Sequence, residues 1–209
     1  MKWEEMTINE YNAALASSSP TPGGGTAAAI ALGQACALTC MVCDLTIGKE
    51  KWQDGWEAAE NALEIAVPMM SKGNQLANED SDAFDQVMAS FSLPKSTDEE
   101  KDARRTAIRT ATLKAAEVPY STAINGVKLL RILPELARKG NANAVTDIGV
   151  ASLLASTAAK GALFNVEINL DSLPEGWGED IKGSMEDIWS EVRTLSRECM
   201  KAVRARMQE

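Results

Sequence analysis

The sequence of 209 residues contains no histidine. Histidine is the only side chain whose unperturbed pKa places its charge change between pH 5 and 8. If the protein is an enzyme, its proton transfers near neutral pH must therefore come from carboxylates, lysine, tyrosine or cysteine with shifted pKa values. This absence leaves few candidate catalytic residues.

The sequence also lacks an excess of positive charge, because its formal net charge is −9 and its pI is about 4.7. Nucleic-acid binding depends on clustered Lys and Arg side chains that neutralise phosphates. We therefore expect no nucleic-acid partner, and any anionic ligand must be met by a local basic pocket. The basic side chains available for such a pocket include Lys49, Lys51, Lys95, Arg104 and Arg105.

Long runs of strongly apolar residues are scarce, and the longest apolar stretch, residues 26–43, consists mostly of alanine and contains Gln34 and Thr39. The stretch reaches the minimum length of a membrane span. Because alanine gives little transfer free energy, we predict a central, closely packed helix and no membrane partner. A membrane span is the alternative.

Only four cysteines are present, and Cys36, Cys40 and Cys43 have spacings that place them on one face of a helix. We predict that they are small buried side chains, with a redox pair in the CMVC segment as the alternative. Neither a disulfide framework nor a charged leader segment is evident, so we expect a cytoplasmic protein.

Apolar residues recur at helical spacing almost throughout, and β-branched clusters are few. The sequence thus predicts an all-α fold: a single-domain helical bundle, residues 1–209, with long antiparallel helices, one of them kinked at Pro119. The stretch NVEINL, residues 165–170, is the only one that reads as extended. The predicted helices span residues 8–16, 26–47, 53–71 (interrupted by Pro68), 75–91, 97–139 (broken again near Pro134), 143–164 and 180–207.

The segment SSSPTPGGGTAAA, residues 17–29, places a glycine triplet before the alanine-rich helix. Each glycine costs roughly 1 kcal/mol of helix or strand stability relative to alanine, so three together need a compensating use. One use is a ligand loop, in which bare N–H groups at a helix start meet a flat or anionic ligand. Plain close packing is the other.

Four carboxylates lie within seven residues in LANEDSDAFDQVMAS, namely Glu79, Asp80, Asp82 and Asp85. Glu79, Asp82 and Asp85 share one helical face, and like charges so close raise the pKa of at least one carboxyl group. Near a pocket, such a group could exchange protons. The alternative is a solvated acidic face.

Asparagines are unusually frequent around the helix expected at 143–164. Asn141, Asn143 and Asp147 lie near its start, whereas Asn165 and Asn169 follow its end. They could simply cap helices and turns. However, the small residues of this helix would let it pack closely against the alanine-rich helix and bring asparagines near the glycines.

Six segments, in this order, resemble the cyclodeaminase and cyclohydrolase family of folate enzymes over roughly residues 5–172. They are SSSPTPGGGTAAA, MVCDLTIGKEKW, DSDAFDQVM, LPKSTDEEK, AAEVPYS, and GNANAVTDIGVA through NVEIN. The resemblance implies an all-helical homodimer that acts on one-carbon derivatives of tetrahydrofolate, with no cofactor beyond this substrate and no metal.

The resemblance also implies site residues. Asp82 would be the acid/base carboxylate, and we assign Lys49 a catalytic role beside it. The glycines would line the pterin site, and the substrate-binding set expected from the family motifs is Pro22, Gly23, Gly24, Gly25, Lys95, Asn143, Asp147 and Asn165.

The chain contains no formiminotransferase domain, and two of its segments look closest to stand-alone cyclohydrolases. We therefore expect a methenyltetrahydrofolate cyclohydrolase, which hydrolyses 5,10-methenyltetrahydrofolate to 10-formyltetrahydrofolate. The alternatives are a formiminotetrahydrofolate cyclodeaminase, which releases ammonia from 5-formiminotetrahydrofolate, and a non-catalytic folate-binding helical dimer.

Overall fold

The computed structural model describes residues 2–209, and in this range it contains helices and no strand, which confirms the all-α prediction. Three short 3₁₀ turns, Trp3–Glu5, Glu50–Gly55 and Ala142–Ala144, connect or precede the helices. The α-helices are α1 (Ile8–Leu15), α2 (Gly24–Thr46), α3 (Trp56–Phe91), α4 (Asp98–Lys139), α5 (Val145–Asp171) and α6 (Glu179–Arg206).

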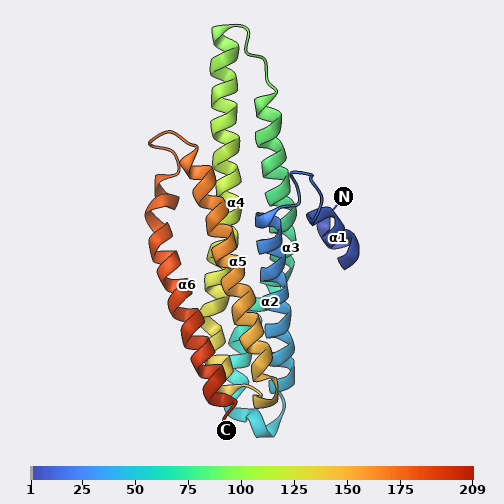
Figure 1. Cartoon of the computed structure of the whole chain (residues 1–209). Helices are drawn as coiled ribbons and strands as arrows, with labels where there is room; N and C mark the ends of the chain where they lie inside the picture. The colour runs from blue at the N-terminus through green and yellow to red at the C-terminus, as the bar shows by residue number, and fades with distance from the viewer. Residues whose placement is uncertain (1) are drawn as a thin grey trace.

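Helices α2 to α6 form an elongated bundle in which consecutive helices run in opposite directions, and α1 lies against its side (Figure 1). Helix α2 packs against both α3 and α5. The first residues of α2 lie toward the end where α3 and α4 project, and its last residues lie at the opposite end (Figure 1). The two ends of α2 therefore belong to different ends of the molecule.

Two helix starts follow the capping signals in the sequence. The Thr7 hydroxyl accepts a hydrogen bond from the N–H of Glu10, and the Thr97 hydroxyl accepts one from Glu100. In each case the glutamate side chain accepts from the threonine N–H. These reciprocal bonds satisfy helix-terminal N–H groups that have no partner within the helix.

Helix α3 is continuous, so the predicted break after residue 71 is wrong. Pro68 lies on the exposed face, where water can bind the carbonyl that its missing N–H leaves free. Gly73 is a packing residue, since a Cβ there would lie 2.8 Å from the Gly33 nitrogen and 3.0 Å from the Ala29 oxygen. The glycine lets α3 approach the backbone of α2.

The stretch 165–170 is the last part of α5, so the prediction of an extended segment is also wrong. Val166 and Leu170 are buried at helical spacing, whereas Ile168 between them is exposed. The Asn169 amide donates to the Asn165 carbonyl at 2.8 Å and to the Ala115 carbonyl of α4 at 2.9 Å. These bonds and contacts hold the helix to its end at Asp171.

Helix α4 continues through both Pro119 and Pro134, so the predicted break near Pro134 is wrong. Both prolines are buried in contacts with neighbouring helices. Such contacts offset the hydrogen bond that each proline removes.

The tip of the α3–α4 hairpin extends past the other helices (Figure 1). We call residues 84–111 the arm. Ser90 is the only residue in it that is buried. Four large apolar side chains of the arm are exposed: Phe84, Met88, Phe91 and Leu93.

Helix α2 is long and apolar enough to cross a membrane by length and composition, but 61% of its most apolar window is buried inside the bundle. Its mean hydropathy there is 1.7. Burial by α3 and α5 accounts for this composition and agrees with the predicted central helix.

Candidate functional site

The glycine triplet forms the start of α2. Pro22 is buried, its peptide bond with Thr21 is cis, and Gly23 caps the helix with an extended backbone. A Cβ at Gly25 would lie 2.2 Å from Oδ1 of Asp80. Glycine is therefore required at this position because the carboxylate of α3 occupies the place of a side chain.

Asp80 is a carboxylate of this site with a perturbed pKa. Burial raises its pKa, whereas hydrogen bonds from the Thr26 hydroxyl and backbone amide act in the opposite direction. Thr26 Oγ1 donates to Asp80 Oδ2 at 3.1 Å, and Thr26 itself is fully buried. A carboxylate with a raised pKa beside a helix N-terminus is a candidate acid or base.

A second hydroxyl extends the contacts of Thr26. Ser81 Oγ lies 3.1 Å from Thr26 Oγ1 and accepts the Trp3 indole N–H at 2.9 Å. The segment that precedes α1 is thereby connected to the start of α2 through α3.

Beneath α1 lies a cavity of about 340 Å³, a size typical of small-molecule sites. Tyr11 contributes a buried hydroxyl that has no hydrogen-bond partner among residues 2–209, and burial together with the charge of Asp80 raises its pKa. Three carboxamides, those of Asn12, Gln34 and Asn74, contribute to the wall. The lining residues are Trp3, Glu4, Met6, Ile8, Tyr11, Asn12, Ala27, Ile30, Ala31, Gln34, Asn74 and Ala77.

Helix α5 brings Asn165 to the glycine turn, as the packing argument predicted. A Cβ at Gly24 would lie 3.7 Å from Asn165 Nδ2, which donates to the Gly161 carbonyl at 2.9 Å. Asn165 can therefore contact a ligand placed over the bare start of α2.

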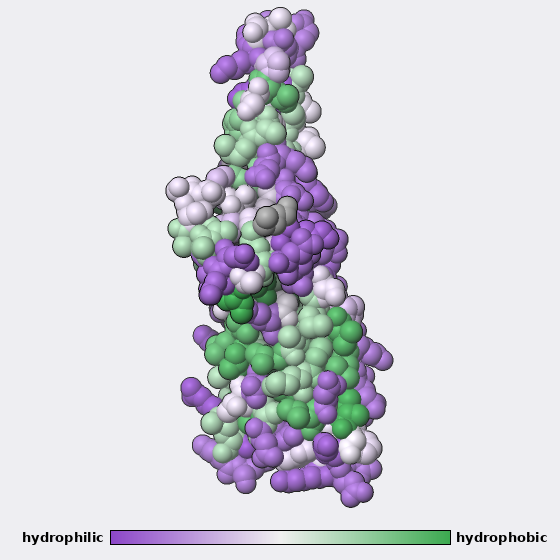
Figure 2. Space-filling model, turned by 90° about the vertical axis from the view of Figure 1, so that its right-hand side faces the viewer, coloured by the Kyte–Doolittle hydropathy of each residue, from purple (hydrophilic) through white to green (hydrophobic). Residues whose placement is uncertain are grey.

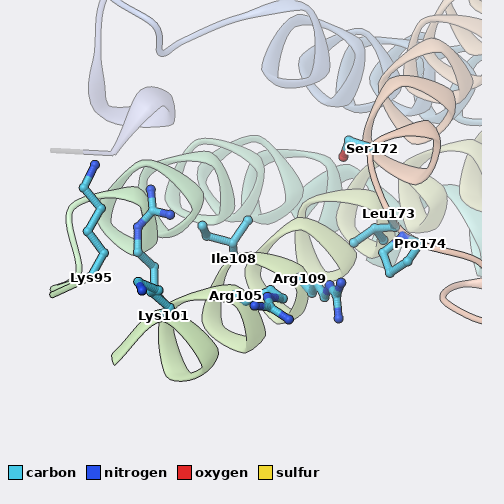
Figure 3. A pocket seen from close by; sticks show the side chains of 9 residues that line it. Lys95, Lys101, Arg105, Ile108, Arg109, Ser172, Leu173 and Pro174 are labelled. Atoms are coloured by element: carbon cyan, nitrogen blue, oxygen red, sulfur yellow. The ribbon is translucent and has the colours of Figure 1, made fainter. Parts of the chain in front are cut away.

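A basic pocket of about 700 Å³ lies between the arm and the end of α5 (Figure 3). Ile108, Leu173 and Pro174 give it apolar surface, and no carboxylate of the described residues lines it. Lys101 and Arg105 pair with Asp98 and Asp102, whereas among residues 2–209 neither Lys95 nor Arg109 has a carboxylate partner. The lining residues are Lys95, Lys101, Arg104, Arg105, Ile108, Arg109, Ser172, Leu173 and Pro174.

Arg104 is held in place within this pocket. Its Nε and Nη2 donate to the Phe91 carbonyl at 3.3 and 3.1 Å, and its guanidinium lies 5.5 Å from the Phe91 ring centroid. The predicted need for a local basic pocket in an acidic protein thus has a structural candidate, which contains Lys95, Arg104 and Arg105.

The remaining sequence-predicted residues lie elsewhere. Asp82 is exposed, two residues from Asp80 and so on a different face of α3. Lys49 and Asn143 are exposed, Asp147 is half-buried, and all three lie at the opposite end of the bundle. Since α2 has 23 residues, about 35 Å separates the glycine turn from that end.

The three clustered thiols behave as buried side chains. Burial raises the pKa of Cys36 and of Cys43 to about 12, and it raises the pKa of Cys40 as well. A thiol that resists deprotonation is a poor nucleophile. The interpretation of these cysteines as small packing residues fits the structure better than a redox pair.

Our sequence analysis missed Asp80 as the carboxylate of the glycine turn, although the residue stood among the four acidic candidates. A signal existed. Gly73, Leu76, Ala77 and Ala83 are buried on α3, and Asp80 occurs at the position that continues this helical stripe. A carboxylate on an apolar face is a stronger indication of function than an acidic cluster.

Comparisons with known proteins agree with these features. The family model described as "Formiminotransferase-cyclodeaminase" matches residues 7–187. The chain is 35% identical to a methenyltetrahydrofolate cyclohydrolase of Methylorubrum extorquens over 202 residues, which is 96% of this chain and 97% of that protein.

Two further relatives carry the cyclodeaminase name. The formimidoyltransferase-cyclodeaminase of Gallus gallus is 33% identical over 80% of this chain, which corresponds to 31% of that longer protein. The crystal structure of a formiminotetrahydrofolate cyclodeaminase from Thermotoga maritima superposes with a TM-score of 0.80 at 27% identity, covering 98% of this chain and 97% of that one. The chain belongs to the formiminotransferase-cyclodeaminase family.

Proposed function

We propose that the protein is a methenyltetrahydrofolate cyclohydrolase, an enzyme that hydrolyses 5,10-methenyltetrahydrofolate to 10-formyltetrahydrofolate. Support comes from the 35% identity to a cyclohydrolase of nearly the same length. The structural observation that carries the proposal is the Asp80 carboxylate, which lies directly over Gly25 at the start of α2 and has a raised pKa.

The chemistry requires little beyond a positioned base. The methenyl bridge is an amidinium cation, so its carbon already accepts a nucleophile. Asp80 takes a proton as a water oxygen bonds to this carbon, and the proton then passes to N5 as the carbon–N5 bond breaks. The hydroxyl on the same carbon releases its remaining proton to solvent as the formyl C=O bond forms. A carboxylate with a raised pKa is a stronger base than an ordinary one, and such catalysis contributes about 10²- to 10⁴-fold.

This proposal assigns the acid/base role to Asp80 in place of Asp82. Asp82 is exposed in the protomer, whereas Asp80 is adjacent to the glycines that we expect to line the pterin site together with Pro22 and Asn165. No cofactor beyond the folate substrate and no metal enters this scheme.

The basic pocket would bind the carboxylates of the glutamate tail. Lys95 and Arg109 have no carboxylate partner in the part of the chain that the structure describes, so they are available to an anionic ligand. Ser172 of this pocket caps the end of α5 and lies seven residues after Asn165, or about 10 Å along the helix direction. A folate whose ring lies at the glycine turn would therefore extend toward the arm.

We also propose a homodimer. Large apolar side chains are exposed on the outer faces of α2 and α3, namely Met41, Leu45, Val67 and Met70. Figure 2 shows an apolar patch on the lower half of this side of the molecule. A second copy packed antiparallel there would bring its own Lys49 end toward the glycine turn, which explains why the family motifs occur at both ends of the bundle.

A cytoplasmic location accompanies this proposal, since the four cysteines are free thiols and three of them are buried. The cyclodeaminase activity remains the second candidate, because the superposed Thermotoga maritima structure carries that name and both reactions pass through a tetrahedral carbon between N5 and N10.

The test is to follow loss of the methenyl chromophore with purified protein, in parallel with ammonia release from 5-formiminotetrahydrofolate. We expect the methenyl substrate to be turned over faster. Asp80→Asn should lower kcat by about 10²- to 10⁴-fold, whereas the kcat of Asp82→Asn should stay close to that of the unsubstituted protein. If the methenyl chromophore is lost no faster with the protein than in buffer alone, the protein is not a cyclohydrolase, and the alternative of a non-catalytic folate-binding dimer is favoured.

A further inference from the structure

Three hydrogen bonds connect the beginning of the chain to the carboxylate at the glycine turn. The Trp3 indole N–H donates to Ser81 Oγ at 2.9 Å, and Ser81 Oγ lies 3.1 Å from Thr26 Oγ1. Thr26 Oγ1 donates to Asp80 Oδ2 at 3.1 Å. The cyclohydrolase scheme above uses Asp80 and gives Trp3 no role.

The direction of these bonds follows from the chemistry of the first donor. An indole nitrogen can only donate, so Ser81 must accept from it. The hydroxyl hydrogen of Ser81 is then free to point at Thr26. The hydrogen of Thr26 in turn points at the carboxylate, and Thr26 Oγ1 also accepts the N–H of Gly23 at 3.5 Å.

Hydroxyls that accept one bond and donate another polarise each other, which strengthens each bond by about 10–30%. The last bond in this series ends on an ionised acceptor, where hydrogen bonds are strongest. Ser81 and Thr26 are buried, so water does not readily replace a lost partner. A donor at the start of the series therefore affects the carboxylate at its end.

We propose that Trp3 is a positioning residue for Asp80: its indole fixes the orientation of the Ser81 and Thr26 hydroxyls so that both donate toward the carboxylate. The proposal rests on the role of Asp80 in the proposed function.

Trp3 is itself held in place from several sides. Its backbone N–H donates to Asn78 Oδ1 at 2.9 Å, and the Asn78 amide donates to Glu4 at 2.5 Å. The Trp3 ring also meets the Tyr11 ring edge-on, with centroids 6.4 Å apart. These contacts seat the indole before any ligand binds.

Two neutral groups face the turn of Asp80 from neighbouring helices: α1 presents the Tyr11 phenol, and α5 contributes the amide of Asn165. On α3 itself, Glu79 pairs with Lys72 and Asp82 is exposed. In the segment before α1, Glu4 bonds Asn78. Thr26 is therefore the main group that opposes the effect of burial on the Asp80 pKa.

The test is the pH dependence of kcat/KM in Trp3→Phe, which keeps an aromatic ring and removes the donor. We expect the acid limb to move to higher pH, so that kcat/KM below its midpoint falls about threefold while the plateau at higher pH is kept. The matched control is Trp189→Phe, which also removes an indole bond to another side chain, Glu167, but takes no part in the series that ends at Asp80. Its profile should not move.

Two further measurements separate this inference from the proposed function. A ¹³C NMR titration of the Asp80 carboxyl group does not depend on activity, and its midpoint should also move to higher pH in Trp3→Phe. If Trp3→Phe does not fold, Ser81→Ala interrupts the same series one bond later and should give the same shift. An unchanged acid limb and an unchanged carboxyl titration in a folded variant would overturn the role of Trp3, whatever the activity of the protein.

Discussion

At the residue scale, the candidate site depends on two side chains from distant parts of the chain that occupy one small volume. Gly25 has no side chain, and the Asp80 carboxylate fills the space that one would need. Both residues stood out in the sequence, the first as part of a triplet and the second as one of four acids. Their contact was not predictable, because it depends on the register between α2 and α3.

The pKa of Asp80 gives a prediction about stability. Because burial raises this pKa above 3.8, the folded state binds protons more readily than the unfolded state. The contribution of Asp80 to stability is therefore greatest below its unfolded pKa and is lost as the pH rises through its folded pKa. Asp80→Asn should be more stable than the unsubstituted protein at neutral pH, by about 0.5–2 kcal/mol.

Urea unfolding between pH 3 and pH 8 would measure this difference, which should vanish toward the acid end of the range. Asp82→Asn serves as the control, since Asp82 is exposed. A destabilised Asp80→Asn at neutral pH would show that the carboxylate contributes net stability, contrary to the effect of burial.

At the scale of helices, the sequence predicted the existence and type of every long element, and the errors lie at their ends and joints. Pro68 and Gly73 suggested that one helix stops and another begins. The stretch NVEINL, residues 165–170, suggested an extended segment. Both are local signals, and packing against neighbouring helices overrides them, which single-sequence patterns do not reveal.

Gly73 tests this explanation. Gly73→Ala would place a Cβ 2.8 Å from the Gly33 nitrogen, so α2 and α3 must separate, and we expect a loss of about 1–3 kcal/mol of stability. Gly183→Ala is the control, because a Cβ there has open space on α6, and it should stabilise the protein by about 0.5–1 kcal/mol. Thermal unfolding of both variants would check the difference. An unchanged stability of Gly73→Ala would contradict the close approach of α2 and α3.

At the scale of the whole molecule, the residues suggested by the family motifs divide between two ends of one bundle. Asn165 and the glycines lie at one end, and Lys49, Asn143 and Asp147 lie at the other. The sequence did not predict this division, because motif order says nothing about the direction of a helix. A protomer alone cannot assemble all of them into one site.

Mixing variants tests whether two copies share a site. If each site uses Asp80 of one copy and Lys49 of the other, Asp80→Asn and Lys49→Ala should each be inactive as pure proteins. After joint unfolding and refolding, half of the dimers are mixed, and each mixed dimer has one intact site. Activity should return to about a quarter of the unsubstituted level.

Light scattering would establish the dimer independently, and Met41→Lys within the apolar patch should weaken it. If the mixture stays inactive although mixed dimers form, both residues belong to the same copy or Lys49 serves another purpose. A fully active Lys49→Ala would remove this residue from the site altogether.

The arm has a consequence for how tightly the substrate is bound. Because Ser90 is the only buried residue in 84–111, few tertiary contacts protect this hairpin, and its amide hydrogens should exchange with solvent far sooner than those of α2. Most of the basic pocket is carried on this loosely anchored part. Capture of the anionic tail must therefore be coupled to ordering of the hairpin, so the free energy of ordering is subtracted from the affinity.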